Sequence, residues 1–184
     1  NNADVTFLCS TENEHSYSTE LNHYKCNNCG TVFVGNKVES EELGVAYATL
    51  NTKDYYKDIE IENKKKMNTA IAHLESSIEK QSEIIDIGTG NGLFIELLNN
   101  AGYMNVSAHD IQGNDLSKIE KNAKQIYQDY NYICIPSGKF DVVTLLDVLE
   151  HVLDPQFLIN SVSRILKEDG IIYFHTPIVT RTDI

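Results

Sequence analysis

The sequence predicts an α/β protein in which a parallel sheet is wrapped by helices, with a small separate module at the amino terminus. From residue 82 onward, short apolar runs alternate with stretches of helical periodicity, which is typical of parallel sheets. The run Val142–Leu146 is apolar enough to be covered on both faces. The first forty residues are poor in large aliphatic side chains and contain three of the four cysteines. We therefore expect this module to be stabilised by a cross-link, such as a bound metal ion, rather than by a hydrophobic core of its own.

The elements of the sheet domain follow from the spacing of apolar and turn-forming residues. The predicted strands are 83–87, 106–110, 132–135, 140–146 and 171–174. The predicted helices between them are 93–100, about 115–127 and 157–167. The second of these helices is expected to turn four apolar residues inward, namely Leu116, Ile119, Ala123 and Ile126.

A helical connector is predicted before the sheet. Four apolar residues at spacings of four, three and four form one stripe on a helix, and they are Met67, Ile71, Leu74 and Ile78. The basic run Lys64–Lys66 precedes this stripe, and we interpret it as a solvated helix start. The predicted organisation is a small module at 1–40, a connector at 41–80 and a sheet domain at 81–184.

The overall charge excludes some classes of partner. The chain has 27 acidic and 15 basic residues and a net charge of −12, and such a surface repels phosphate backbones and anionic lipids. No apolar run approaches the roughly 20 residues of a membrane span. We therefore expect no nucleic-acid partner, no membrane and a cytoplasmic location.

A glycine-rich loop, Gly88–Gly92, follows the first strand of the sheet domain. Glycines let the backbone turn sharply and a ligand approach closely, and the free N–H groups of the next helix point into the same crevice. A dinucleotide site in a Rossmann-like sheet would place the third glycine five positions after the first, but Gly92 lies four positions after Gly88. Asp86 would repel a pyrophosphate, and it suits a ligand that carries an amino group.

A second carboxylate, Asp110, ends the next strand, 24 positions after Asp86. A carboxylate at this place can accept both hydroxyls of a ribose, and the alternative is an aspartate that serves only the turn. The candidate cofactor-binding residues are Asp86, Gly88, Thr89, Gly90, Gly92, Asp110 and Asp147.

An acidic and basic group, Asp147, Glu150 and His151, follows the predicted strand 140–146. A histidine beside a carboxylate can act as a general base, because the carboxylate orients and polarises the imidazole. Glu150 and His151 are the candidate catalytic residues, and His175 ends the last strand at the same edge. Two alternatives stay open: the group could hold a divalent cation, or it could only cap a helix and shape the floor of the pocket.

The cysteines of the first forty residues predict a structural zinc site. Cys26 and Cys29 lie two residues apart, and Gly30 allows the tight turn of a knuckle. Zinc prefers four ligands in a tetrahedron, and the candidate ligands are Cys9, His15, Cys26 and Cys29, with His23 or Glu12 as alternatives to His15. The site could also be degenerate and empty. Cys134, in an apolar run, is expected to be a small buried residue.

These residues resemble class I S-adenosylmethionine-dependent methyltransferases over about residues 67–178. The matching segments are Asp86–Gly92, Phe140–Val143, Leu149–Pro155 and Leu166–Gly170. The resemblance implies S-adenosylmethionine as the cofactor, with Asp86 and Gly88 near its amino-acid end and Asp110 on its ribose. The polar residue that binds the adenine after the third strand in this family has no clear match in the segment 134–139.

The segment His23–Phe33 resembles the zinc-ribbon leader of some sugar methyltransferases, although Glu12 stands where a further cysteine is expected. Sugar C-methyltransferases use a Glu-His pair in proton transfer at the position of Glu150 and His151, whereas some quinone-type O-methyltransferases use similar residues for a metal. Members of the family have two further strands after the fifth, so the resemblance implies a chain truncated at its carboxyl end.

The resulting functional hypothesis is S-adenosylmethionine-dependent methyl transfer to a small molecule, such as a sugar nucleotide or another glycan precursor. His151, helped by Glu150, would remove a proton from the acceptor. The alternative hypothesis is a non-catalytic module that binds the cofactor or a protein partner.

Overall fold

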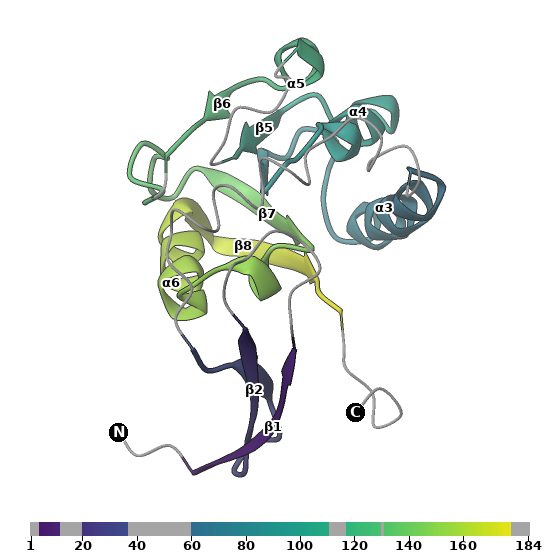
Figure 1. Ribbon diagram of the computed structural model, residues 1–184. Coiled ribbons are helices and arrows are strands. Elements are labelled where there is room, and N and C mark those ends of the chain that lie inside the picture. The colour runs from purple at the N-terminus through teal and green to yellow at the C-terminus, as the bar shows by residue number, and fades with distance from the viewer. Residues whose placement is uncertain (1–3, 12–19, 37–59, 111–116, 130, 178–184) are drawn as a thin grey trace. The chain divides into compact units, whose positions relative to one another are not determined.

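The computed structural model describes residues 4–11, 20–36, 60–110, 117–129 and 131–177 (Figure 1). The chain divides into two compact units, one of residues 57–178 and the other of residues 1–56 with 179–184. A five-stranded sheet lies in the first of these units and a three-stranded sheet in the second.

The five-stranded sheet is the centre of the unit 57–178. Its strands are β4 (Ile84–Ile87), β5 (Val106–His109), β6 (Ile126–Tyr127), β7 (Phe140–Leu146) and β8 (Leu166–His175). They lie in the order β6-β5-β4-β7-β8, and each neighbouring pair is parallel, so the predicted parallel sheet is confirmed. From β4 the chain adds strands toward one side of the sheet, to β5 and β6, and then returns to add β7 and β8 on the other side, so the switch point lies between β4 and β7. Ligands of such sheets bind beyond the carboxyl ends of the strands at this switch point.

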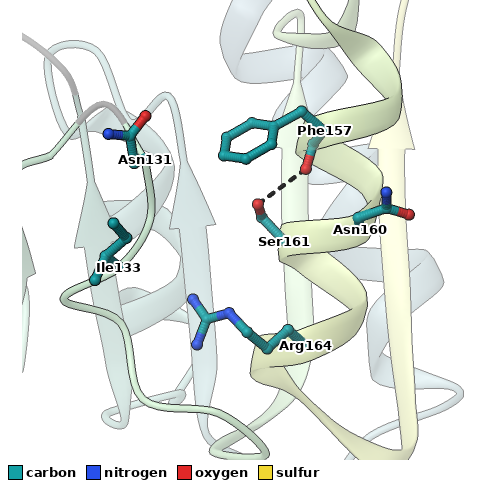
Figure 2. Close-up of a pocket in the computed structure, with 6 residues that line it drawn as sticks. All are labelled: Asn131, Ile133, Phe157, Asn160, Ser161 and Arg164. Carbon is teal, nitrogen blue, oxygen red and sulfur yellow. Dashed lines mark hydrogen bonds between the residues drawn. The ribbon is translucent and has the colours of Figure 1, made fainter.

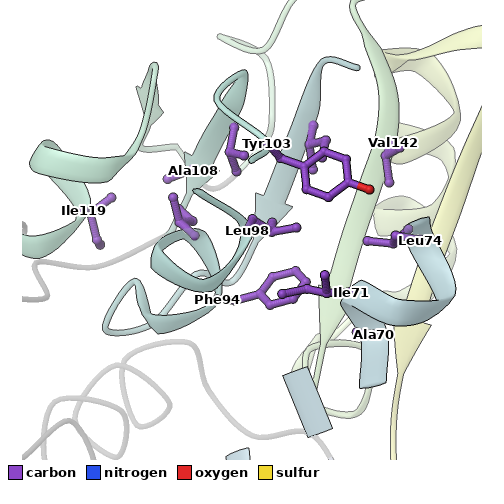
Figure 3. Packing of buried hydrophobic residues seen from close by; sticks show 12 residues of the cluster. Ala70, Ile71, Leu74, Phe94, Leu98, Tyr103, Ala108, Ile119 and Val142 are labelled. Carbon is purple, nitrogen blue, oxygen red and sulfur yellow. The ribbon is translucent and has the colours of Figure 1, made fainter. Parts of the chain in front are cut away.

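Helices cover both faces of this sheet (Figure 1). The helices of the unit are α3 (Glu60–Glu75), α4 (Leu93–Asn100), α5 (Ser117–Asn122) and α6 (Pro155–Ile165). Alternate strand residues face opposite sides: Ile84 packs in the cluster shared with α3 and α4, whereas Ile85 packs in the cluster shared with α6. Figure 3 shows the first cluster, in which Phe94, Leu98 and Tyr103 are fully buried. Within the described residues, no helix is long and apolar enough to cross a membrane.

Helix α3 lies in the predicted connector and packs on the same core. Its Ala70, Ile71 and Leu74 are buried. Of the predicted stripe, Ile71 and Leu74 are thus confirmed, Met67 is partly buried against the same core, and Ile78 also packs there but lies beyond the end of the helix at Glu75. On the same helix, His73 Nδ1 lies 3.3 Å from the hydroxyl of Tyr173 on β8. The connector helix therefore contributes to the sheet domain rather than only leading to it.

The lysines of the run 64–66 have different surroundings. Lys64 is exposed and pairs with Glu60 one turn earlier at 2.5 Å, as expected of a solvated helix start. Lys66 instead forms an ion pair with Asp147, which follows β7. The interpretation of the whole run as solvated is therefore wrong for Lys66, because only packing decides which helix face meets the sheet.

The third strand lies earlier in the chain than the sequence predicts. Instead of a continuous helix over 115–127, the short helix α5 is followed by strand β6. The backbone turns to the sheet edge here, because Lys124 N donates to Val106 O at 2.7 Å and Ala108 N donates to Gln125 O at 2.8 Å. These bonds satisfy the edge of β5 and override the helical spacing of the apolar side chains.

The predicted strand 132–135 is a turn region instead. Asp129 Oδ2 accepts the N–H of Ile133 at 2.6 Å, and Tyr132 has a φ of 56°, which no strand residue adopts. The prediction that Cys134 is buried is also wrong, since its side chain is exposed. Leu116, predicted to face inward, lies outside the described residues.

The described part of the other unit is a three-stranded antiparallel sheet. Its strands, β1 (Val5–Thr11), β2 (Leu21–Cys26) and β3 (Val32–Val34), lie in the order β1-β2-β3. A row of aromatic rings crosses one face, with ring centroids 5.5 Å apart for Phe7 and Tyr24 and 6.2 Å apart for Tyr24 and Phe33. Cross-strand pairs of this kind stabilise a small sheet that has little core.

Candidate functional site

The glycine loop packs tightly against two neighbouring segments. Gly88 has a φ of 72°, and a Cβ there would lie 2.5 Å from Cγ2 of Val148, just after β7. Gly92, which caps α4, has a φ of 77°, and its Cβ would lie 2.9 Å from Cγ1 of Ile119 on α5. Only glycine adopts these conformations without strain. The two glycines are thus needed for packing within the chain as well as for the sharp turn.

Asp86 is buried at the end of β4 and is only 3% exposed. Its carboxylate accepts the hydroxyl of Thr144 at 2.6 Å and the hydroxyl of Thr89 at 2.7 Å. Burial raises the pKa of this carboxyl from 3.8 to about 6, although both hydroxyls act to lower it, and nearby Asp110 raises it further. Thr144, directly opposite Asp86 on β7, is a site residue that the sequence reasoning missed. The sequence does contain a sign of this role, because Thr144 is the one polar residue in the otherwise apolar run Val142–Leu146.

Asp110 follows β5 and lies beside the glycine loop. Its Oδ2 accepts the N–H of Gly90 at 2.8 Å, while the N–H groups of Gly88 and Thr89 both donate to the carbonyl of His109, at 2.8 and 3.1 Å. The end of β5 therefore holds the loop in shape. The predicted residues Asp86, Thr89, Gly90 and Asp110 are brought together at one edge of the sheet.

Asp147 is the point where three elements meet beyond the end of β7. Its Oδ1 accepts Nδ1 of His175 at 2.6 Å, and its Oδ2 pairs with Lys66 from α3. Burial acts to raise the pKa of Asp147, but hydrogen bonds from Lys66 and His175 outweigh it and hold that pKa below its ordinary value. Both carboxylate oxygens thus have partners within the chain. Lys66 was missed as a site residue because nothing in its own segment indicates a partner on β7.

The predicted catalytic pair lies on a short 3₁₀ helix, Leu149–His151. Oε1 of Glu150 lies 3.9 Å from Nε2 of His151, and Oε2 of Glu150 accepts the hydroxyl of Thr176 at 3.0 Å. The His151 side chain is 54% exposed. The pair is therefore adjacent as predicted, and Glu150 is linked to the segment that follows β8. Among the described residues, no group of three or more His, Cys, Asp or Glu side chains could hold a metal ion, and this includes Asp147, Glu150 and His151.

The corrected position of the third strand brings an acidic residue to the same edge. Asp129 follows β6, and Oδ1 of its carboxylate is buried, with a long contact of 3.5 Å to Nε2 of His109. Nearby, Nε2 of His109 bonds the backbone carbonyl of Asp129 at 2.8 Å, and burial lowers the pKa of His109, so this imidazole is neutral. The sequence reasoning missed Asp129 because it placed the third strand at 132–135.

A groove of about 570 Å³ lies away from this edge, between α6 and the loop that precedes β7 (Figure 2). Two of its polar lining residues have partners within the chain. Arg164 donates to the carbonyls of Tyr132 and Ile135 at 2.5 and 2.9 Å, and the hydroxyl of Ser161 donates to the carbonyl of Phe157 at 2.9 Å. The glycine loop and its two carboxylates lie elsewhere, at the carboxyl edge of the sheet, and we assign the candidate site to that edge.

The described residues do not fit the predicted zinc site. Cys9 lies opposite His23 in the sheet, whereas Cys26 lies three residues further along β2 and opposite Val5. Three residues span about 10 Å and reverse the face, but sulfurs on one zinc ion lie within about 4.6 Å of each other, twice the Zn–S distance. Cys9 therefore does not join Cys26, and among the described residues the three cysteines do not gather as one group of metal ligands. His15 and Glu12 lie outside the described residues.

The Cys26 and Cys29 pair itself is held by the turn between β2 and β3. Gly30 N donates to the carbonyl of Cys26 at 2.8 Å, and the Cys29 thiol lies 3.2 Å from the hydroxyl of Thr31. Hydrogen bonds from Thr31 and then from Cys26 lower the pKa of Cys29. The two thiols of the knuckle thus interact with each other, while Cys9 lies apart from them in the sheet.

Known proteins resemble this chain in sequence. A family model described as a methyltransferase domain matches residues 59–182. The ubiquinone biosynthesis O-methyltransferase of Actinobacillus pleuropneumoniae serotype 7 (strain AP76) is 33% identical over 106 residues, which cover 51% of this chain and 45% of that protein. The chain spans about half the length of the curated relatives it matches.

Solved structures share the fold at low sequence identity. The complex between the Haloferax volcanii Trm112 methyltransferase activator and a methyltransferase matches with a TM-score of 0.61 and 18% identity, over 75% of this chain and 61% of that one. The 4+2 cyclase SpnF matches with a TM-score of 0.52 and 14% identity, over 59% and 44%. Because these likenesses concern the fold alone, they do not specify the reaction.

The matched family segment contains the whole parallel sheet, the glycine loop and the Glu150–His151 pair. The order of its strands and the two carboxylates beside the loop agree with the fold that the sequence predicts. This chain therefore belongs to the methyltransferase-domain family, with the class I S-adenosylmethionine-dependent fold.

Proposed function

We propose that this chain binds S-adenosylmethionine at the carboxyl edge of its sheet and transfers the methyl group to a small molecule. The observation that carries the proposal is the pair of carboxylates, Asp86 and Asp110, on either side of one glycine loop at the switch point. S-adenosylmethionine supplies a methyl group on a positively charged sulfur, together with an amino group and a ribose. Two carboxylates suit these groups and would repel a pyrophosphate.

The two carboxylates beside the loop would bind different parts of the cofactor. Asp110 holds the loop through the N–H of Gly90, and a carboxylate at the end of the second strand is suited to accept ribose hydroxyls. Asp86, desolvated at the end of β4, favours a cationic amino group nearby. We further propose that Asp129 binds the amino group of the adenine, because its Oδ1 is buried and has only a long contact of 3.5 Å with Nε2 of His109.

The proton of the acceptor must leave when the methyl group is transferred. The Glu150–His151 pair is the candidate that the sequence indicates for this step, and the link from Thr176 to Glu150 supports it by orienting the carboxylate. A positioned base contributes about 10²–10⁴-fold to such a reaction. Exclusion of water and correct alignment supply the rest.

The acceptor is proposed at the level of its chemical class. The family resemblance of the leader suggests a sugar nucleotide or another glycan precursor, whereas the relatives named ubiquinone biosynthesis O-methyltransferases suggest a hydroxyl on a ring. Catechol and a nucleoside diphosphate sugar, each supplied with S-adenosylmethionine, separate the two. Methylated product from one acceptor and none from the other decides the class.

Calorimetry with S-adenosylmethionine and S-adenosylhomocysteine tests the binding itself. We expect Asp110→Ala to weaken both ligands by at least about 30-fold, since about 2 kcal/mol is lost with a charge-assisted hydrogen bond. Asp110→Asn keeps an acceptor for Gly90 and should lose less. Asp169→Ala, which removes an exposed carboxylate of β8, is the matched control and should bind as the unaltered chain does.

Two outcomes would contradict the proposal in different ways. If neither ligand binds the unaltered chain, both methyl transfer and cofactor binding are wrong. If both bind but no acceptor is methylated, the alternative of a non-catalytic cofactor-binding module is favoured instead.

A further inference from the structure

Three side chains from three separate elements converge beyond the end of β7. Lys66 comes from α3, Asp147 follows β7 and His175 ends β8. Lys66 and His175 each contact the carboxylate of Asp147. We propose that His175, oriented by Asp147 and Lys66, accepts the acceptor's proton during methyl transfer. This inference rests on the proposed function and assigns its proton-accepting step to a residue other than His151.

The hydrogen bond between the two residues determines the chemistry of the imidazole. Nδ1 of His175 lies 2.6 Å from Oδ1 of Asp147, and an ionised carboxylate can only accept, so Nδ1 carries the ring hydrogen. Nε2 is then the unprotonated nitrogen and the one able to take a proton. A carboxylate on the far nitrogen also stabilises the imidazolium that forms.

Asp147 is held more firmly than an ordinary loop carboxylate. Its φ of 55° places a non-glycine residue in the left-handed region, which costs about 1–2 kcal/mol. Its N–H donates to the carbonyl of His175 at 2.9 Å, so backbone and side chain of these two residues are joined twice. Lys66 occupies the other carboxylate oxygen. Strain that is held by several partners is a feature of functional sites.

The cluster lies at the same carboxyl edge of the sheet as the glycine loop. Leu146 pairs with His175 across β7 and β8, and Val148, the residue after Asp147, fills the space beside Gly88 that a side chain would occupy. The proposed amino-acid end of the cofactor lies at Gly88. His175 is thus one strand away from the segment that contacts this loop.

The two candidate histidines differ in how they are oriented. His175 has a direct 2.6 Å bond to a carboxylate that is itself held by a cation. His151 lies 3.9 Å from Glu150 and is the more exposed, at 54% against 42% for His175. A base must be positioned as well as basic, so the geometry favours His175.

The proton balance of the step is simple. The carbon–oxygen bond to the methyl group forms as the carbon–sulfur bond breaks, and the O–H bond of the acceptor breaks as an N–H bond forms at Nε2. His175 becomes positively charged and passes the proton to water afterwards. The charged groups around it are Asp147 and Lys66 in the cluster, with Glu150 joined to the neighbouring Thr176 and His151 beside Glu150.

The imidazole nitrogen chemical shifts of His175, measured by NMR in the S-adenosylhomocysteine complex, test the cluster without depending on turnover. In the unaltered chain they should show the ring hydrogen on Nδ1, because Asp147 accepts there. Asp147→Asn removes the ionised acceptor and should give a mixture of the two tautomers. Lys66→Met removes the group that holds the other oxygen of Asp147 and should give a smaller change toward that mixture. Lys65→Met, an exposed neighbour on the same helix, is the matched control and should leave the tautomer unchanged.

Turnover of catechol tests the role in catalysis. We expect His175→Gln to lower kcat by about 10²–10⁴-fold and to remove the acidic limb of the pH profile, while the affinity for S-adenosylhomocysteine stays within twofold. Asp147→Asn should lower kcat by about 10–100-fold, as expected of a residue that orients another. Where catechol is not methylated, the nucleoside diphosphate sugar takes its place.

The inference is overturned if His175→Gln keeps the kcat and pH profile of the unaltered chain while His151→Gln loses them. It is equally overturned if Lys66→Met and Asp147→Asn leave the tautomer of His175 as it was, and this readout holds even where His175→Gln does not fold. Failure of the unaltered chain to bind S-adenosylmethionine is a different result, which contradicts the proposed function instead.

Discussion

Gly88→Ala should weaken binding of S-adenosylmethionine by about 100-fold or more. The new Cβ would lie 2.5 Å from Cγ2 of Val148, at a residue whose φ of 72° is already unfavourable for alanine. The strain of about 1–2 kcal/mol and the overlap can be relieved only if the loop moves away from β7. A displacement of the loop removes the alignment of Asp86 and Asp110 on which binding is proposed to depend. Calorimetry measures the loss of affinity, and thermal unfolding measures the loss of stability.

Gly138 provides a matched control for this substitution. It has a similar φ of 61°, but a Cβ there would meet nothing within 4 Å. Gly138→Ala should therefore cost about 1 kcal/mol of stability and leave the affinity unchanged. In the double variant, Val148→Ala removes the crowded methyl group and should restore part of the binding lost in Gly88→Ala. Equal affinities of Gly88→Ala and Gly138→Ala would show that the contact with Val148 does not shape the site.

Asp86→Asn should stabilise the fold at neutral pH while it weakens cofactor binding. Burial raises the pKa of Asp86 from 3.8 to about 6 in the folded chain. Well below pH 3.8 the carboxyl is protonated in both the folded and unfolded states, and it costs nothing. As the pH rises from about 4 to about 6, the unfolded state ionises first, and about 3 kcal/mol of stability is lost by the pH at which the folded state also holds the buried charge. An asparagine carries no such charge, and its amide can still bond the hydroxyls of Thr89 and Thr144.

Urea unfolding at several pH values measures this effect. The free energy of unfolding of Asp86→Asn, minus that of the unaltered chain, should grow by about 3 kcal/mol between pH 4 and pH 8. The affinity of the unaltered chain for S-adenosylmethionine should rise over the same range as Asp86 becomes charged, whereas that of Asp86→Asn should stay low, because its amide offers the cationic amino group no carboxylate. A difference in stability that does not change with pH would mean that Asp86 is not titrating in this window, and the assignment of the buried charge would be wrong.

Asp86 illustrates why a binding residue can lower the stability of a fold. The carboxylate is desolvated in the absence of a cation, and two hydroxyl groups offset only part of that cost. A bound amino group would supply the missing opposite charge. The site is in this sense prepared for its ligand at the expense of the unliganded chain.

The sequence determined those features that depend on local pattern. The strand at Ile84–Ile87, the glycine loop and the helix Leu93–Asn100 were predicted within a residue or two, as was the strand Phe140–Leu146. These segments have apolar runs long enough to be buried, or glycines at positions of positive φ, so each residue's own chemistry limits its structure. The adjacency of Asp86, Thr89, Gly90 and Asp110 followed from the same pattern, since carboxyl ends of parallel strands share one edge.

Tertiary structure alone decided the features that depend on a partner distant in sequence. Strand β6 has two residues, too few for a periodic signal, and it exists because the open edge of β5 accepts its backbone. Whether Cys9 could meet Cys26 depended on how β1 pairs with β2, including the bulge in β1. A shift of one residue in this pairing would turn every side chain of β1 to the other face of the sheet. The cluster of Lys66, Asp147 and His175 joins residues up to 109 positions apart, and their contact arises only when α3 packs beside the sheet. Local sequence restricts the conformation of each segment. Which other segment it packs against is determined by the free energy of packing, which is gained only when the whole sheet assembles.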